Sequence, residues 1–152
     1  MPDYFVRMGS ENEGVIVRDG LSIKAIIDSD LAYKPDAPDF ILCNLGVNDG
    51  VTGNGDFTQW VLDYQYIIDT LHVMWPSARV LVAKVATSTG DWTAMDDTHI
   101  PNVIAGRSWA GIGIDERTVL GANWGAYTTD GIHPNATGYD RVAAAWQVAM
   151  GY

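Results

Sequence analysis

Apolar residues in this chain occur in two patterns, continuous runs and longer stretches with helical spacing. The runs at 39–50 and 78–87 are almost unbroken, and the first ends in a cluster of glycine, asparagine and aspartate. Runs of this kind are typical of strands that are buried on both faces of a parallel sheet. Shorter runs at 4–8, 14–20 and 111–115 are rich in β-branched and aromatic residues or flanked by glycine, and they predict further strands.

Three stretches instead place apolar residues three or four positions apart, as one face of an amphipathic helix requires. They span residues 21–35, 56–76 and 135–150. Asp56 or Thr58 is expected to cap the second helix, because short polar side chains at this position accept a hydrogen bond from a free backbone N–H. The first two stretches end at prolines, which terminate helices.

The order of these elements predicts the fold class. Strands that alternate with helices are typical of an α/β fold with a mostly parallel sheet, here as one domain over residues 1–152. Residues 88–113 are polar, aromatic and rich in glycine, so we expect a long surface segment there that includes a short helix. Ligands of such sheets bind at the carboxyl ends of the strands. The polar clusters at 46–49 and 130–135 are expected to meet at that edge.

Composition and charge exclude several classes of function. The chain has 19 acidic residues against 9 lysines and arginines, a formal net charge of −10. This balance argues against a nucleic-acid partner, whose phosphates attract basic residues, and it suits a neutral small-molecule substrate. No apolar run approaches the roughly 18 residues of a membrane span. The N-terminus shows no signal peptide, which leaves the compartment of the protein open.

The cysteine and histidines do not have the spacing of a metal site. Cys43 lies in an apolar run and is expected to be an inert core residue. His72, His99 and His133 are far apart, whereas zinc sites draw on closely spaced ligands. We therefore expect neither a metal nor a cofactor. His72 is predicted to lie on a helix surface or in the core, and His99 is a weak candidate for a pocket wall.

The segment 130–135, D-G-I-H-P-N, combines an aspartate and a histidine just before a predicted helix. Histidine changes protonation near neutral pH, so His133 can act as a general base and then as a general acid. Asp130 is close enough in sequence to orient the imidazole and to stabilise its charged form. The side-chain amide of Asn48 and the backbone N–H of Gly20 can donate hydrogen bonds to an oxyanion. Together these groups are suited to acyl transfer.

These segments resemble the motifs of the SGNH (GDSL-type) hydrolases, a family of esterases and lipases. Gly46–Asp49 resembles the G-x-N-D block of the family, and Asp130–Asn135 resembles its D-x-x-H-P-N block. Arg18–Ser22 resembles the block that supplies a glycine to the oxyanion hole. The resemblance extends over roughly residues 14–150. It implies a flavodoxin-like three-layer sandwich, and it assigns the base, the orienting acid and the two oxyanion donors to the residues derived above.

The nucleophile block of the family, a G-D-S that follows the first strand, is not present. Ser10 follows the first predicted strand, but the segment G-S-E-N-E-G before the next strand has the length of a hairpin, which would place Ser10 at the wrong end of the sheet. Ser22 lies near Gly20 at the start of a helix and is a weak nucleophile candidate, because a serine there is well suited to cap the helix. Nothing in the sequence favours Ser88 or Ser108.

Three interpretations of the missing block remain open. The chain is a shortened member of the family whose first strand and serine lie elsewhere, or an active variant that uses Ser22 or Ser10. Alternatively, it is an inactive relative that binds carbohydrate or serves in assembly. In the first case an exposed sheet edge would favour a homo-oligomer. Ester turnover distinguishes the enzyme from the binding module.

Aromatic residues suggest the class of substrate. The chain has 6 tryptophans and 7 tyrosines, and aromatic rings near a site stack on sugars or grip acyl chains. Trp124 and Tyr127 lie just before Asp130 and are the candidates for lining the pocket. Three other tryptophans are expected in the core: Trp60, Trp75 and Trp146. We expect a small ester, such as an acylated sugar, an inference that rests on the family more than on these residues.

Overall fold

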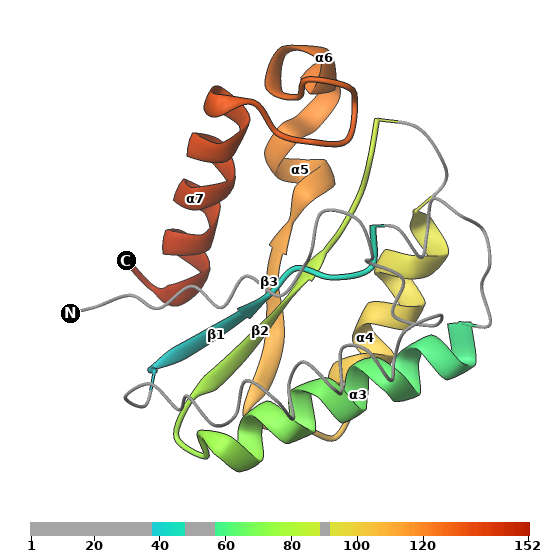
Figure 1. The fold of residues 1–152 in the computed structure, drawn as a ribbon, viewed down its shortest axis with the longest axis vertical. Helices are drawn as coiled ribbons and strands as arrows, with labels where there is room; N and C mark the ends of the chain where they lie inside the picture. Colours follow the sequence, from blue (N-terminus) through green and yellow to red (C-terminus); the bar gives the residue numbers. More distant parts are fainter. Residues whose placement is uncertain (1–37, 48–56, 89–91) are drawn as a thin grey trace.

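A three-stranded parallel sheet lies at the centre of the structure, a computed structural model that describes residues 38–47, 57–88 and 92–152 (Figure 1). The strands, in their order across the sheet, are β1 (Phe40–Cys43), β2 (Arg79–Lys84) and β3 (Ala110–Asp115). Ile41 of β1 pairs with Val80 of β2, and Val80 pairs with Ala110 of β3. The strands predicted in these three regions are therefore confirmed.

Helix α3 (Phe57–Met74) covers one face of the sheet and confirms the helix predicted there (Figure 1). Its buried side consists of five side chains: Trp60, Tyr64, Ile67, Ile68 and Leu71. Thr58, one of the two predicted caps, lies inside the helix, because α3 already begins at Phe57, whose ring packs against the core. Outside the described residues lie the other predicted cap, Asp56, the strands predicted at 4–8 and 14–20, and the helix predicted over 21–35.

Part of the segment 88–113 packs into the core, whereas its composition predicted a surface segment throughout. It contains a π-helical turn, η1 (Met95–His99), which continues into α4 (Ile100–Ile104). Four of its apolar side chains are buried: Trp92, Met95, Ile100 and Val103. Composition does not show that Asp96 is buried, because Oδ2 of this carboxylate pairs with Arg117 from a later part of the chain.

Helix α7 (Ala136–Met150) covers the opposite face of the sheet from α3 and α4 (Figure 1). Asn135 caps this helix, since its side-chain oxygen accepts a hydrogen bond from the N–H of Gly138 at 3.0 Å. Trp146 packs so closely on Gly113 of β3 that any side chain at that position would meet its ring. The predicted three-layer α/β sandwich is thus confirmed.

The core confirms the expectations for three tryptophans and for the cysteine. Trp60, Trp75 and Trp146 are at most 6% exposed. Cys43 is buried as well, and burial raises the pKa of its thiol to about 12. A protonated thiol is a poor nucleophile, so Cys43 acts as a small apolar side chain.

The longest helix of the described residues is α3, with 18 residues. Within the three described ranges, no helix combines the length and the apolar character that crossing a membrane requires.

The three strands are parallel, and their carboxyl ends point toward the upper half of Figure 1. There β3 continues into α5 (Glu116–Leu120), η2 (Gly121–Asn123) and α6 (Trp124–Tyr127). The chain then turns through residues 128–135 before it enters α7. Ligands of parallel sheets bind at this end, so the fold brings the D-G-I-H-P-N segment to the expected place.

Candidate active site

Residues 128–135 form a closed turn at the carboxyl end of the sheet. Thr128 and Pro134 face each other in an isolated antiparallel bridge. The backbone N–H of Thr129 donates to the carbonyl of His133 at 2.9 Å. These contacts join the two arms of the turn, so the residues between them are held by backbone hydrogen bonds as well as by side chains.

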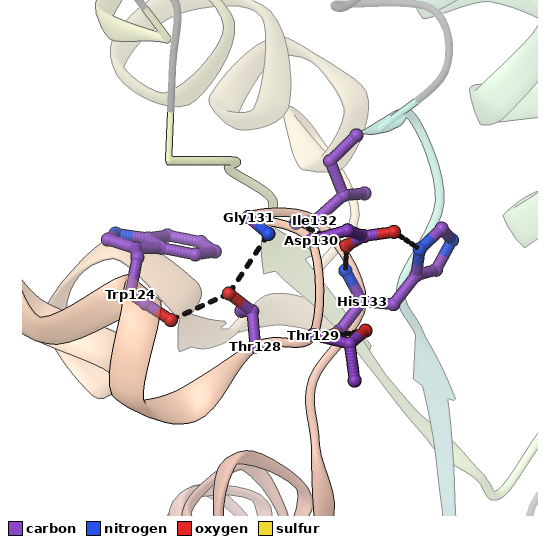
Figure 2. A network of polar contacts seen from close by, with 7 residues as sticks. All are labelled: Trp124, Thr128, Thr129, Asp130, Gly131, Ile132 and His133. Carbon is purple, nitrogen blue, oxygen red and sulfur yellow. Dashed lines mark hydrogen bonds and ion pairs between the residues drawn. The ribbon is translucent and has the colours of Figure 1, made fainter.

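The Asp130 carboxylate contacts three nitrogen atoms inside this turn (Figure 2). Its Oδ1 accepts from the backbone N–H groups of Ile132 and His133, at 2.9 and 2.8 Å. Its Oδ2 lies 2.6 Å from Nδ1 of His133. The backbone and ring nitrogens of His133, together with the N–H of Ile132, hold the pKa of Asp130 well below its usual range. The carboxylate is therefore ionised at neutral pH.

His133 is oriented by Asp130 and open to solvent. Contact with a carboxylate favours the proton on Nδ1, which leaves Nε2 of the neutral ring as a proton acceptor. The side chain of His133 is 69% exposed and that of Asp130 is 50% exposed. The structure thus brings these two predicted residues together, with most of the imidazole exposed to solvent.

Gly131 lets the turn pass close to the segment that follows β2. Its φ of +84° lies in the left-handed region that favours glycine. The carbonyl of Gly131 accepts a hydrogen bond from the N–H of Ser88 at 2.8 Å, and a Cβ on Gly131 would lie 2.3 Å from Ser88 Oγ. The N–H of Gly131 donates to Thr128 Oγ1, which in turn donates to the carbonyl of Trp124 at 2.6 Å (Figure 2). The turn is therefore anchored on both sides.

A buried carboxylate, Glu116, connects the ends of the three strands. It directly follows β3 as the first residue of α5, and it is 7% exposed. Its Oε1 accepts from Nδ2 of Asn44, just after β1, at 2.8 Å, and its Oε2 accepts from the N–H of Ala86, just after β2, at 3.2 Å. Burial raises the pKa of Glu116, and the two donors oppose this effect.

Four residues that the sequence predicts for the site lie outside the described residues: Asn48, Gly20, Ser22 and Ser10. The segment that leads to Asn48 is described as far as Val47. Within it, Gly46 has a φ of +114°, and a Cβ there would lie 2.9 Å from the ring of Trp60 in α3. The oxyanion donors and the nucleophile therefore stay predictions.

The predicted pocket residues Trp124 and Tyr127 lie on α6, directly before the turn. Trp124 is half-buried and packs against the core, and in Figure 2 its ring lies on the other side of Thr128 from His133. The guanidinium of Arg141 lies over the ring of Tyr127, 4.4 Å from the ring centroid. Neither contact involves His133, so a role in lining a pocket stays a prediction.

The other two histidines make contacts with aromatic rings. His72 stacks on Trp109 with ring centroids 4.1 Å apart, and His99 stacks on Phe57 at 4.6 Å. Across residues 38–47, 57–88 and 92–152, no three side chains of histidine, cysteine, aspartate or glutamate are grouped so that they could hold a metal ion.

Reasoning from the sequence missed Glu116 and Asn44, and it gave no reason to favour Ser88. Glu116 carries one signal that could have identified it, since it is an acidic residue directly after a predicted strand, at the end where ligands bind. Asn44 shows no such signal, because its partner is 72 residues away in the sequence.

The chain is similar to one known family and to solved structures. The GDSL-like Lipase/Acylhydrolase family matches residues 12–141. A carbohydrate esterase family 3 protein from Talaromyces cellulolyticus has a TM-score of 0.62 and 23% identity, over 90% of this chain and 67% of its own. A structure described as a peptidoglycan O-acetylesterase in action has a TM-score of 0.53 and 20% identity, over 74% of this chain and 36% of its own. No curated protein sequence matches the chain.

Proposed function

Because the chain belongs to the GDSL-like lipase/acylhydrolase family, we propose that it hydrolyses carboxylic esters with His133 as the general base and Asp130 as its orienting acid. The observation that carries this proposal is the 2.6 Å contact between Nδ1 of His133 and Oδ2 of Asp130. The family match over residues 12–141 includes both residues.

The proposed reaction is acyl transfer in two halves. Nε2 of His133 takes the proton of an attacking hydroxyl, and the hydroxyl oxygen bonds to the carbonyl carbon of the ester. The tetrahedral intermediate collapses as His133 passes the proton to the leaving alcohol. Water then repeats these steps on the acyl-enzyme and releases the acid. The ionised carboxylate of Asp130 stabilises the imidazolium in both halves.

Asn48 and Gly20 are proposed as the donors to the oxyanion. Support for Asn48 comes from the segment that leads to it, which packs on α3 at Gly46 and is bonded through Asn44 to Glu116. An oxyanion donor that is in place before the reaction is worth about 3 kcal/mol of the barrier.

Three serines are candidates for the nucleophile. Ser22 and Ser10 follow from the sequence. Ser88 joins them because its N–H donates to the carbonyl of Gly131, two residues before His133. A serine nucleophile needs its hydroxyl within reach of the base, and these candidates can be separated by chemical labelling.

We propose a small acyl group on a sugar as the substrate. Two solved structures with this fold are described as a carbohydrate esterase and as a peptidoglycan O-acetylesterase. The chain also places two aromatic residues, Trp124 and Tyr127, directly before the turn, where rings can stack on a sugar. A net charge of −10 suits a neutral ester better than an anionic one.

The test compares wild type with His133→Ala on p-nitrophenyl acetate and on acetylated xylan. We expect turnover in the wild type and a loss of at least about 100-fold in kcat for the variant. His72→Phe is the matched control, because phenylalanine can keep the stack on Trp109, and it should retain the wild-type rate. Equal turnover in wild type and His133→Ala would contradict the proposal.

A fluorophosphonate probe followed by peptide mapping identifies the nucleophile. We expect one adduct, on Ser22, Ser10 or Ser88, that is lost in His133→Ala. Binding of acetylated sugar without any release of acetate would instead favour the binding module.

A further inference from the structure

The carboxylate of Glu116 holds two segments that lead to the candidate active site. On one side it accepts a hydrogen bond from Nδ2 of Asn44 at 2.8 Å, and on the other from the N–H of Ala86 at 3.2 Å. The side chain of Glu116 is 7% exposed. Hydrogen bonds to a buried side chain are strengthened by the low dielectric constant around it.

The contact with Asn44 holds the segment after β1. Asn44 comes directly after the last residue of this strand, and the chain continues through Gly46 to Asn48, the proposed oxyanion donor. Gly46 itself packs on the ring of Trp60. The described part of this segment is therefore fixed at two points, by the bond to Glu116 and by packing on α3.

The contact with Ala86 leads to the turn that carries the general base. Two residues after Ala86, the N–H of Ser88 donates to the carbonyl of Gly131 at 2.8 Å. Gly131 lies two residues before His133. A short run of backbone and two hydrogen bonds thus connects Glu116 with the base.

We infer that Glu116 is a positioning residue, whose carboxylate sets the segment after β1 and the segment after β2 at the spacing that catalysis needs. The inference rests on the proposed ester hydrolysis. Glu116 takes no part in the chemical steps and acts through Asn44 and Ala86. Displacement of a catalytic group by about 1 Å lowers turnover by about 100-fold, so loosening either contact should reduce kcat.

A role in folding alone would give a different result. The loss of a buried hydrogen-bonded carboxylate lowers stability wherever it lies, but the molecules that remain folded would then turn over at the wild-type rate. A positioning role lowers kcat of folded protein and leaves KM nearly unchanged, because it acts on the transition state more than on substrate binding.

The test exchanges the donor and the acceptor between two residues. In Glu116→Gln one amide oxygen replaces two carboxylate oxygens, so the new NH2 group faces a donor, either the amide of Asn44 or the N–H of Ala86. In Asn44→Asp two carboxylates face each other. The double variant N44D/E116Q restores the pair, since the new NH2 group donates to the new carboxylate and the amide oxygen still accepts from Ala86.

With p-nitrophenyl acetate, each single variant is expected to lower kcat by about 10- to 100-fold, with KM within about twofold of the wild type. The double variant is expected to recover most of the lost kcat. A wild-type kcat in Glu116→Gln, or a double variant no faster than the single ones, would overturn the inference.

Asn44→Ala keeps the test decisive should Glu116→Gln fail to fold. Asn44 is exposed, so its truncation leaves the core intact; Tm should fall because Oε1 of Glu116 loses its donor, and kcat of the folded protein should fall as well. A wild-type kcat in Asn44→Ala overturns the inference as well. Asp69→Asn is the matched control, because it weakens the two 2.7 Å contacts between Asp69 and Arg107. It should lower Tm and leave kcat unchanged.

His133→Ala in the same assay separates two failures. If ester turnover is absent or does not depend on His133, the proposed function fails and the role of Glu116 fails with it. If turnover depends on His133 while Glu116→Gln and Asn44→Ala keep the wild-type kcat, ester hydrolysis stands and the positioning role alone is overturned.

Discussion

The Asp130 carboxylate meets His133 at two points, the backbone N–H at 2.8 Å and Nδ1 of the ring at 2.6 Å. The first contact fixes the main chain of the histidine and the second fixes its side chain. One residue, three positions earlier in the sequence, therefore sets both the place and the orientation of the imidazole.

Asp130→Asn is expected to lower kcat by about 1000-fold or more without unfolding the protein. The new NH2 group cannot accept a hydrogen bond from Nδ1, so the imidazole loses its preferred tautomer and the imidazolium loses its counter-charge. Turnover of p-nitrophenyl acetate measures the loss, and circular dichroism checks the fold. Asp140→Asn, at an exposed position on α7, is the control and should keep its activity. A decrease of less than about tenfold would show that another group orients His133.

The low pKa of Asp130 predicts a pH dependence of stability. The ordinary pKa of an aspartate is 3.8, and the hydrogen bonds from His133 and Ile132 lower it in the folded chain. The unfolded chain therefore takes up the proton at a higher pH, so the stability that Asp130 contributes is present above 3.8 and is lost as the pH falls below it. Thermal unfolding should show that the Tm advantage of wild type over Asp130→Asn shrinks from about pH 5 to about pH 2.

The raised pKa of Glu116 acts in the opposite sense, since a group that prefers its neutral form in the fold loses stability as the pH rises. Because wild type and Asp130→Asn both contain Glu116, its contribution cancels in the difference between their Tm values. An advantage of wild type over Asp130→Asn that grows toward acid pH would contradict the assignment to Asp130.

Gly131→Ala should cost more stability than Gly106→Ala. Both glycines have a positive φ, +84° and +76°, so each substitution costs about 1–2 kcal/mol of backbone strain. A Cβ on Gly131 would also lie 2.3 Å from Ser88 Oγ, whereas a Cβ on Gly106 meets nothing within 4 Å. Urea denaturation should show an additional loss of about 1 kcal/mol or more for Gly131→Ala. Equal losses would argue against the close approach of the turn to Ser88.

Gly113→Ala tests the packing of α7 on the sheet. The new Cβ would lie 2.2 Å from Cζ3 of Trp146, a buried ring that cannot move freely. We expect the free energy of unfolding to fall by about 1–3 kcal/mol and to recover in part when Trp146→Leu is added. Gly125→Ala, where a Cβ meets nothing within 4 Å, should change it little. Wild-type stability in Gly113→Ala would show that the two layers are less closely packed than described.

The sequence by itself determined the features that depend only on residues close together along the chain. The apolar runs and the helical spacing predicted β1, β2, β3, α3 and α7, because burial of one face imposes a period on the residues of each element. The contact between Asp130 and His133 is also local and could be predicted from their spacing. Residues three positions apart in a tight turn are close whatever the rest of the fold does.

Only the tertiary structure decided which distant residues meet. Asn44 and Glu116 are 72 residues apart, and no local period indicates that the ends of β1 and β3 share a buried carboxylate. The composition of the segment 88–113 predicted a surface position, because polar side chains are buried only where a partner pairs with them. For Asp96 that partner is Arg117, which comes later in the chain. Periodicity reports that a side chain is buried, but the partner that makes its burial favourable comes from another part of the chain, and folding alone brings the two together.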